Sequence, residues 1–274
     1  MSRYARPWRA LANTAAAKGG SIHDDDRAQE LGFKGAFVPG SVVASAAIPL
    51  IFERYGKAWM EGGWFSFTFV TPVYTSEEVQ AVACAAVGGE KMVAATNHRL
   101  SLQVATRDKR LCCQGEAGLG FHLPWEEQET PWGDVFPELH RDFEFPPAQI
   151  VICFDDIVEM LYAAGDETPW YLGPSPWGAP VVPPEWLLPI ALQTMVGTRV
   201  PLTGAKGPGI WARHQLAICR PLRYDTPYTF SQHVVGKGST ARTLFVEYEF
   251  EVTDADGQLV IGRHQGKFLK RAAA

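Results

Sequence analysis

The sequence predicts an α+β protein made of two similar halves, each with one buried helix followed by an antiparallel run of strands. The first observation is a stretch at 41–55 that is apolar on every side, as a helix is when it is buried all round. The second is the period-two alternation of the stretches after it, which is typical of strands that bury one face. The third is a repeated set of proline landmarks: Val38-Pro39 recurs as Val182-Pro183, and Thr71-Pro72-Val73 recurs as Arg220-Pro221-Leu222.

The first half opens with an extended arm at 3–13 and a short helix that Asp24 can cap and Gly32 can end. The tight turn Val38-Pro39-Gly40 then leads into the buried helix. We expect Ser41 to cap this helix and Pro49 to kink it. Strands are expected at 64–70, 79–87, 100–104 and 111–121.

A proline-rich, acidic stretch separates the halves, and the pattern then starts again. The predicted domains are therefore 1–122, a linker at 123–149, and 150–274. The second half is expected to contain helices at 154–164 and 186–196 and strands at 211–219, 228–235, 244–252 and 259–269, with Asp256-Gly257 as a hairpin turn.

Composition excludes some classes of function. With a net charge of −5, the chain lacks the concentrated basic surface expected of a nucleic-acid-binding protein. There is no apolar run long enough to cross a membrane and no apolar signal core near the N-terminus. The five cysteines are scattered and form no CxxC pair, which is typical of free thiols in a reducing compartment. We expect a cytoplasmic protein with no membrane or nucleic-acid partner.

Several motifs in the first half resemble those of a known family. His23-Asp24-Asp25-Asp26, Gly32-Phe33-Lys34-Gly35, Val38-Pro39-Gly40 and Phe69-Val70-Thr71-Pro72-Val73 resemble the MaoC-like acyl dehydratases and (R)-specific enoyl-CoA hydratases. The resemblance implies a double hotdog fold, in which each repeat wraps a curved antiparallel sheet round a central helix. It also implies a cofactor-free hydratase or dehydratase acting on an acyl thioester of CoA or of an acyl-carrier protein.

The chain departs from that family at one motif. The hydratases carry the string D-x-N-P-x-H, and here Lys18, Gly20 and Ser21 stand at its Asp, Asn and Pro, so that only His23 is kept. Related acyl-carrier dehydratases have an acid one turn inside the buried helix, where this chain has Ser45 and, in the second half, Pro189. The resemblance thus supplies a histidine without its usual acidic partner.

The candidate catalytic residues are His23, Gly40 and Ser41. His23 could move a proton at the carbon next to a thioester carbonyl, or at the water that adds one carbon further on. Backbone N–H groups of Gly40 and Ser41 could hold the carbonyl oxygen. The candidate substrate contacts are Val38 in the pocket wall, Lys18 toward a carboxylate or phosphate, and Tyr171 and Gln193 in the second half.

No cofactor is implied, and no metal motif such as HxH or HExxH is present. His214 and His233 are interpreted as strand residues at a sheet surface.

Alternatives remain open at this point. A hotdog thioesterase would need an activated water and usually a carboxylate near the start of a helix. Glu185 occupies such a place in the second half. The protein could also be a non-catalytic acyl-binding module, or a cyclase or isomerase that reuses the pocket. Two fused repeats can form the usual dimeric unit alone, so both a monomer and a homo-oligomer fit the sequence.

Overall fold

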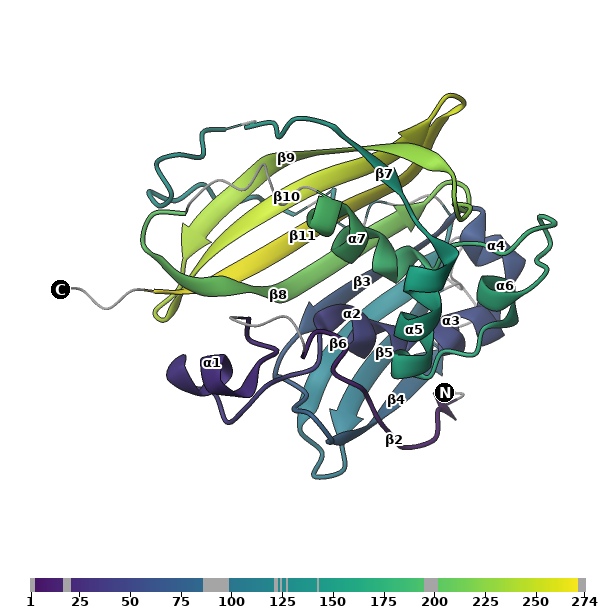
Figure 1. Cartoon of the computed structure of the whole chain (residues 1–274), viewed down its shortest axis with the longest axis horizontal. Coiled ribbons are helices and arrows are strands. Elements are labelled where there is room, and N and C mark those ends of the chain that lie inside the picture. Colours follow the sequence, from purple (N-terminus) through teal and green to yellow (C-terminus); the bar gives the residue numbers. More distant parts are fainter. Residues whose placement is uncertain are drawn as a thin grey trace, which may run out of the picture.

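The computed structural model describes residues 3–16, 21–85, 99–120, 123, 125–126, 128–141, 143–194 and 202–270. Its strands form one 11-stranded antiparallel sheet in the order β1-β4-β5-β6-β3-β8-β11-β10-β9-β7, with β2 paired to β4 (Figure 1). The first-half strands are β1 (Arg3–Ala5), β2 (Arg9–Ala10), β3 (Gly63–Phe69), β4 (Glu78–Ala85), β5 (Arg99–Thr106) and β6 (Leu111–Leu119). The second-half strands are β7 (Ala148–Val151), β8 (Ala205–Ile218), β9 (Pro227–Ser239), β10 (Thr243–Asp254) and β11 (Gly257–Lys270).

The strand order is symmetric about the centre of the sheet. From one edge it runs β1-β4-β5-β6-β3, and from the other edge β7-β9-β10-β11-β8, so each strand on this path has a counterpart at the same place in the other half, and β2 lies off the path. The two halves join where β3 pairs with β8, with Phe67 opposite His214. This symmetry is the physical form of the repeat seen in the proline landmarks. The domain boundaries stay a prediction; β7 begins at Ala148, just inside the range assigned to the linker.

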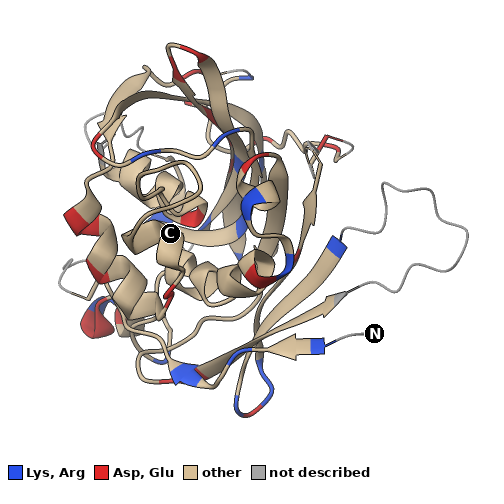
Figure 2. Cartoon of the chain, turned by 90° about the vertical axis from the view of Figure 1, so that its right-hand side faces the viewer, with Lys and Arg blue, Asp and Glu red and all other residues tan. Residues whose placement is uncertain are grey.

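The helices lie on one side of this sheet, which curves round them (Figures 1 and 2). Helix α2 packs against η1 and α5. The buried helices of the two repeats, α2 in the first and η1 with α7 in the second, therefore meet at the middle of the molecule. None of the helices in the described part of the chain is long and apolar enough to cross a membrane. The helices are α1 (Asp25–Glu30), α2 (Gly40–Ser45), α3 (Ile48–Tyr55), α4 (Lys57–Met60), α5 (Phe154–Ala164), α6 (Pro169–Leu172), the 3-10 helix η1 (Pro184–Trp186) and α7 (Leu187–Thr194).

The predicted helix at 41–55 is two helices, α2 and α3. The break falls at Ala46 and Ala47, and Pro49 lies in the first turn of α3, where its missing N–H costs no helical hydrogen bond. The expectation that Ser41 caps the helix was wrong. The helix begins one residue earlier, Pro39 is the N-cap residue, and Ser41 is buried inside the first turn.

Strand β8 is longer than the sequence predicted, beginning at Ala205 instead of 211. The extra residues include glycine and proline, which weaken a strand pattern, yet they pair with the end of β11, where Lys270 lies opposite Ala205. The short helix α1 was predicted correctly, because the Asp24 carboxylate accepts a hydrogen bond from Arg27 N at 2.9 Å.

Candidate functional site

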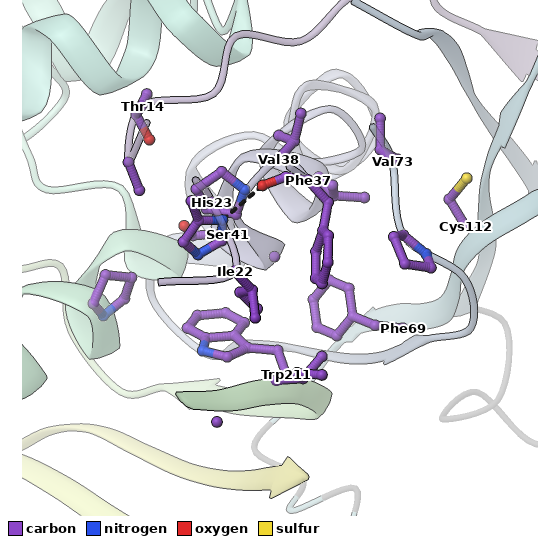
Figure 3. Close-up of a pocket in the computed structure, with 18 of the residues that line it drawn as sticks. Thr14, Ile22, His23, Phe37, Val38, Ser41, Phe69, Val73, Cys112 and Trp211 are labelled. Carbon is purple, nitrogen blue, oxygen red and sulfur yellow. Dashed lines mark hydrogen bonds between the residues drawn. The ribbon is translucent and has the colours of Figure 1, made fainter. Parts of the chain in front are cut away.

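A cavity of about 310 Å³ opens between the repeats, beside the turn that leads into α2 (Figure 3). Most of its wall is apolar. The first repeat contributes Thr14, Ala15, Ile22, His23, Phe37, Val38, Pro39, Gly40, Ser41, Val43, Phe69, Val70, Thr71, Pro72, Val73 and Cys112. The second repeat contributes Met160, Trp186, Pro189, Leu192, Gln193, Gly209, Ile210 and Trp211.

His23 is half-buried in the cavity wall and its ring is fixed by the turn. Its Nδ1 lies 2.6 Å from the carbonyl oxygen of Phe37 (Figure 3). Because a carbonyl oxygen can only accept, Nδ1 carries the hydrogen of the neutral ring and Nε2 is its basic nitrogen. The side chain of Asn13 donates to the backbone oxygen of His23 at 2.8 Å, which holds the loop from the other side.

The turn itself is held by backbone hydrogen bonds on both flanks. Phe37 N donates to Ile22 O at 3.3 Å, and Val38 N donates to Val73 O at 2.8 Å. The Asp25 carboxylate accepts from Ala36 N at 2.8 Å. These contacts tie the His23 loop, the turn and the segment after β3 that contains Val73 into one rigid unit, so the position of His23 relative to α2 is set by the backbone.

The first turn of α2 borders the cavity at Gly40 and Ser41. The first N–H groups of a helix have no acceptor within the helix, so they can donate to a bound oxygen. Gly40 packs closely against Trp211, and a Cβ at this position would lie 3.0 Å from the indole ring. The absence of a side chain at Gly40 therefore allows the first turn of α2 to pack directly against Trp211 in the cavity wall.

Electrostatically the cavity is close to neutral. Among the lining residues that the structure describes, none carries a carboxylate, and the titratable ones are His23 and Cys112. Burial raises the pKa of the Cys112 thiol, so it stays protonated near neutral pH. The site therefore offers an imidazole and backbone amides, within an otherwise apolar wall.

Five of the seven predicted site residues come together here: His23, Gly40, Ser41, Val38 and Gln193. Gln193 reaches the cavity from α7, with its side chain exposed.

Tyr171 is fully buried against Phe52, with ring centroids 5.3 Å apart, and does not line the cavity. Lys18 lies outside the described residues. Glu185, the carboxylate considered for a thioesterase, accepts a hydrogen bond from Ser45 and does not line the cavity either.

His214 is not at a sheet surface, as the sequence suggested, but fully buried behind the cavity floor. Its ring lies 5.0 Å from that of Trp211 and 5.7 Å from that of His264, which faces it across β8 and β11. Burial lowers the pKa of both imidazoles, that of His264 to about 3, so both are neutral at physiological pH. The prediction failed because β8 is a central strand whose inner face is covered by helices.

Within the part of the chain that the structure describes, no three His, Cys, Asp or Glu side chains are grouped so that they could hold a metal ion.

Neither a protein-family model nor a curated protein matches the chain in sequence. Solved structures match it in fold. A proposed MaoC domain protein dehydratase from Chloroflexus aurantiacus J-10-fl has a TM-score of 0.68 at 8% identity, over 99% of this chain and 95% of that chain.

A Mycobacterium tuberculosis protein described as having a double hotdog fold and as essential for survival during infection has a TM-score of 0.61 at 12% identity, over 97% of this chain and 96% of that chain. A proposed oleoyl thioesterase from Lactobacillus plantarum has a TM-score of 0.53 at 9% identity, over 100% of this chain and 98% of that chain. Both dehydratases and thioesterases are thus found among proteins of this shape. The chain is a double hotdog protein, with the fold of solved MaoC-like dehydratases.

Proposed function

We propose that the protein is a hydratase or dehydratase-type lyase that acts on an acyl thioester, such as an enoyl-CoA or a hydroxyacyl-CoA. The observation that carries the proposal is His23: an imidazole of fixed tautomer in the wall of an apolar cavity, beside the first amides of α2. The apolar wall suits an acyl chain, and the amides suit a thioester carbonyl oxygen.

One imidazole can carry both proton transfers of the reaction. In hydration, Nε2 of His23 removes a proton from water while the hydroxyl oxygen bonds to the β carbon of the enoyl thioester. The electron pair of the double bond moves toward the carbonyl oxygen, which the N–H groups of Gly40 and Ser41 stabilise. The imidazolium then returns the proton to the α carbon. Dehydration is the reverse, and neither direction requires an Asp at the motif position where this chain has Lys18.

The activity is tested by incubating the protein with trans-2-octenoyl-CoA and, separately, with 3-hydroxyoctanoyl-CoA, and measuring product masses. The proposal predicts gain of one water in the first case and its loss in the second. Release of free CoA thiol would instead identify a thioesterase, and an unchanged mass with a new retention time would identify an isomerase or cyclase. Binding without any product at high protein concentration would identify an acyl-binding module.

Asn13 is expected to support catalysis through the position of His23. Replacing it with alanine removes the hydrogen bond to the His23 backbone oxygen, a contribution of about 1 kcal/mol, which corresponds to a loss of about fivefold in kcat. Asn13→Asp is the matched variant, because it keeps the acceptor that Ala15 N uses and lacks the donor to His23. Equal losses in the two variants would support the role of the donor, and full activity in Asn13→Asp would contradict it.

A further inference from the structure

A buried hydrogen bond joins side chains of the two central helices directly behind the cavity. Ser45, the last residue of α2, donates from Oγ to Oε1 of Glu185 at 2.9 Å. Glu185 lies in η1, at the start of the second repeat's helix, and both residues are fully buried. Burial of a carboxyl group in such a place costs free energy unless the group has a specific partner, and here the Ser45 hydroxyl is that partner.

The residues on either side of this bond line the cavity. Ser41 lies one helical turn before Ser45 on α2, and Trp186 follows Glu185 directly. Pro189, also in the wall, lies about one turn further along the second helix. The separation of α2 from η1 therefore determines how far Ser41 stands from Trp186 across the cavity.

We propose that Glu185 is a positioning residue: by accepting the Ser45 hydrogen bond it holds the second repeat's helix against α2 and sets the width of the acyl cavity. The inference rests on the proposed function only for the nature of the ligand. Glu185 itself touches no ligand, since it does not line the cavity.

The surroundings of Glu185 make this contact sensitive to charge. Burial and, to a smaller extent, the nearby Asp166 carboxyl together raise the pKa of Glu185 to about 8. The Asp166 carboxyl is itself nearly fully buried, and burial raises its pKa as well. The titratable groups that face the pair are Tyr171 and Tyr224 toward both carboxyls, and Arg6 and Arg9 toward Asp166.

Four oxygens of this cluster have no hydrogen-bond partner within the described residues: Asp166 Oδ2, Glu185 Oε2, Tyr171 Oη and Tyr224 Oη. An ionised Glu185 would therefore place a poorly compensated charge between the helices, beside a second acid. Parting of η1 from α2 would relieve it by admitting water. The neutral carboxyl is the form compatible with the packed arrangement.

The pH dependence of ligand affinity tests whether ionisation of Glu185 changes the shape of the cavity. The probe is S-octyl-coenzyme A, a thioether that cannot be hydrated or hydrolysed, titrated between pH 6.5 and 9.5 by calorimetry. If only the neutral form of Glu185 holds the cavity in shape, affinity of the wild-type protein falls about tenfold by pH 9, in proportion to the neutral fraction. Glu185→Gln keeps an acceptor for Ser45 and cannot ionise, so its affinity is expected to stay flat over this range.

A second readout does not depend on the ligand. In protein labelled with 5-fluorotryptophan, the ¹⁹F resonance of Trp186, assigned by its loss in Trp186→Phe, should shift with a midpoint near pH 8 in the wild type and stay constant in Glu185→Gln. Trp64 serves as the control because it lies on the opposite face of the sheet, against Arg99.

These outcomes separate the two proposals. Failure of S-octyl-coenzyme A to bind at any pH would count against the acyl-thioester function, while the fluorine shift would still decide the role of Glu185. The positioning role is overturned if Glu185→Gln keeps the pH dependence of the wild type, or if the Trp186 resonance does not move. Ser45→Ala, which keeps the acid and loses the bond, is expected to bind the probe more weakly at every pH, with unchanged circular dichroism.

Discussion

Replacing His23 with alanine is expected to lower kcat for trans-2-octenoyl-CoA by about 10² to 10⁴-fold, because the variant loses the group that moves both protons. KM should change little, since the apolar wall and the amides of α2 remain. Steady-state kinetics with the purified variant measure this directly. Circular dichroism and the melting temperature should match the wild type, because His23 is only half-buried and contributes little to the core.

His233 is the matched control for this experiment. It lies on β9, with its ring 3.9 Å from the carboxylate of Glu249 and partly exposed, and it does not line the cavity. His233→Ala should keep kcat within about twofold. If His23→Ala turns over as fast as His233→Ala, His23 has no part in the mechanism.

Replacing Glu185 with glutamine is expected to stabilise the protein increasingly as pH rises. The folded protein keeps a proton on Glu185 up to a pKa of about 8, whereas the unfolded chain releases it near the ordinary value of 4.5. Between these values the folded state binds the extra proton, so the wild type loses stability with rising pH, at about 1.4 kcal/mol per pH unit. The loss is complete above the pKa that Glu185 has in the folded protein. Glu185→Gln has no ionisable group at this position and so does not lose this stability as pH rises.

Urea unfolding of both proteins at pH 5, 6.5 and 8 measures the difference. The free energy of unfolding of Glu185→Gln should exceed that of the wild type by a margin that grows by several kcal/mol over this range. Asp166, whose pKa burial also raises, is present in both proteins and acts in the same direction. A margin that is constant with pH would show that Glu185 ionises equally in the folded and unfolded states.

Local patterns were enough to predict most of the fold. The Asp24 cap of α1 and the alternation of β3 and β10 each depend on residues close together in the sequence, and each has the predicted structure. The break between α2 and α3 shows where this reasoning stops. A sequence that is apolar on every side predicts burial, but whether Pro49 kinks one helix or starts another depends on what packs against it.

Most of the correctly predicted site residues lie in the first repeat, and Gln193 is the predicted residue of the second repeat that lines the cavity. His23, Gly40 and Ser41 are adjacent to one turn, so their proximity follows from the chain itself. Trp211 and Met160 enter the cavity because of how the second repeat docks, and no local motif marks them. The buried Ser45–Glu185 bond was missed for the same reason, since its partners are brought together only by the packing of the two central helices.

The most direct test of this account is a crystal structure of the His23→Ala protein with octanoyl-CoA. We expect the octanoyl chain to lie between Phe69 and Trp211, the thioester oxygen to accept hydrogen bonds from the amides of Gly40 and Ser41, and the α and β carbons to face the place that the imidazole leaves. A thioester bound in any other hollow, or a chain that stays outside the cavity, would contradict the account.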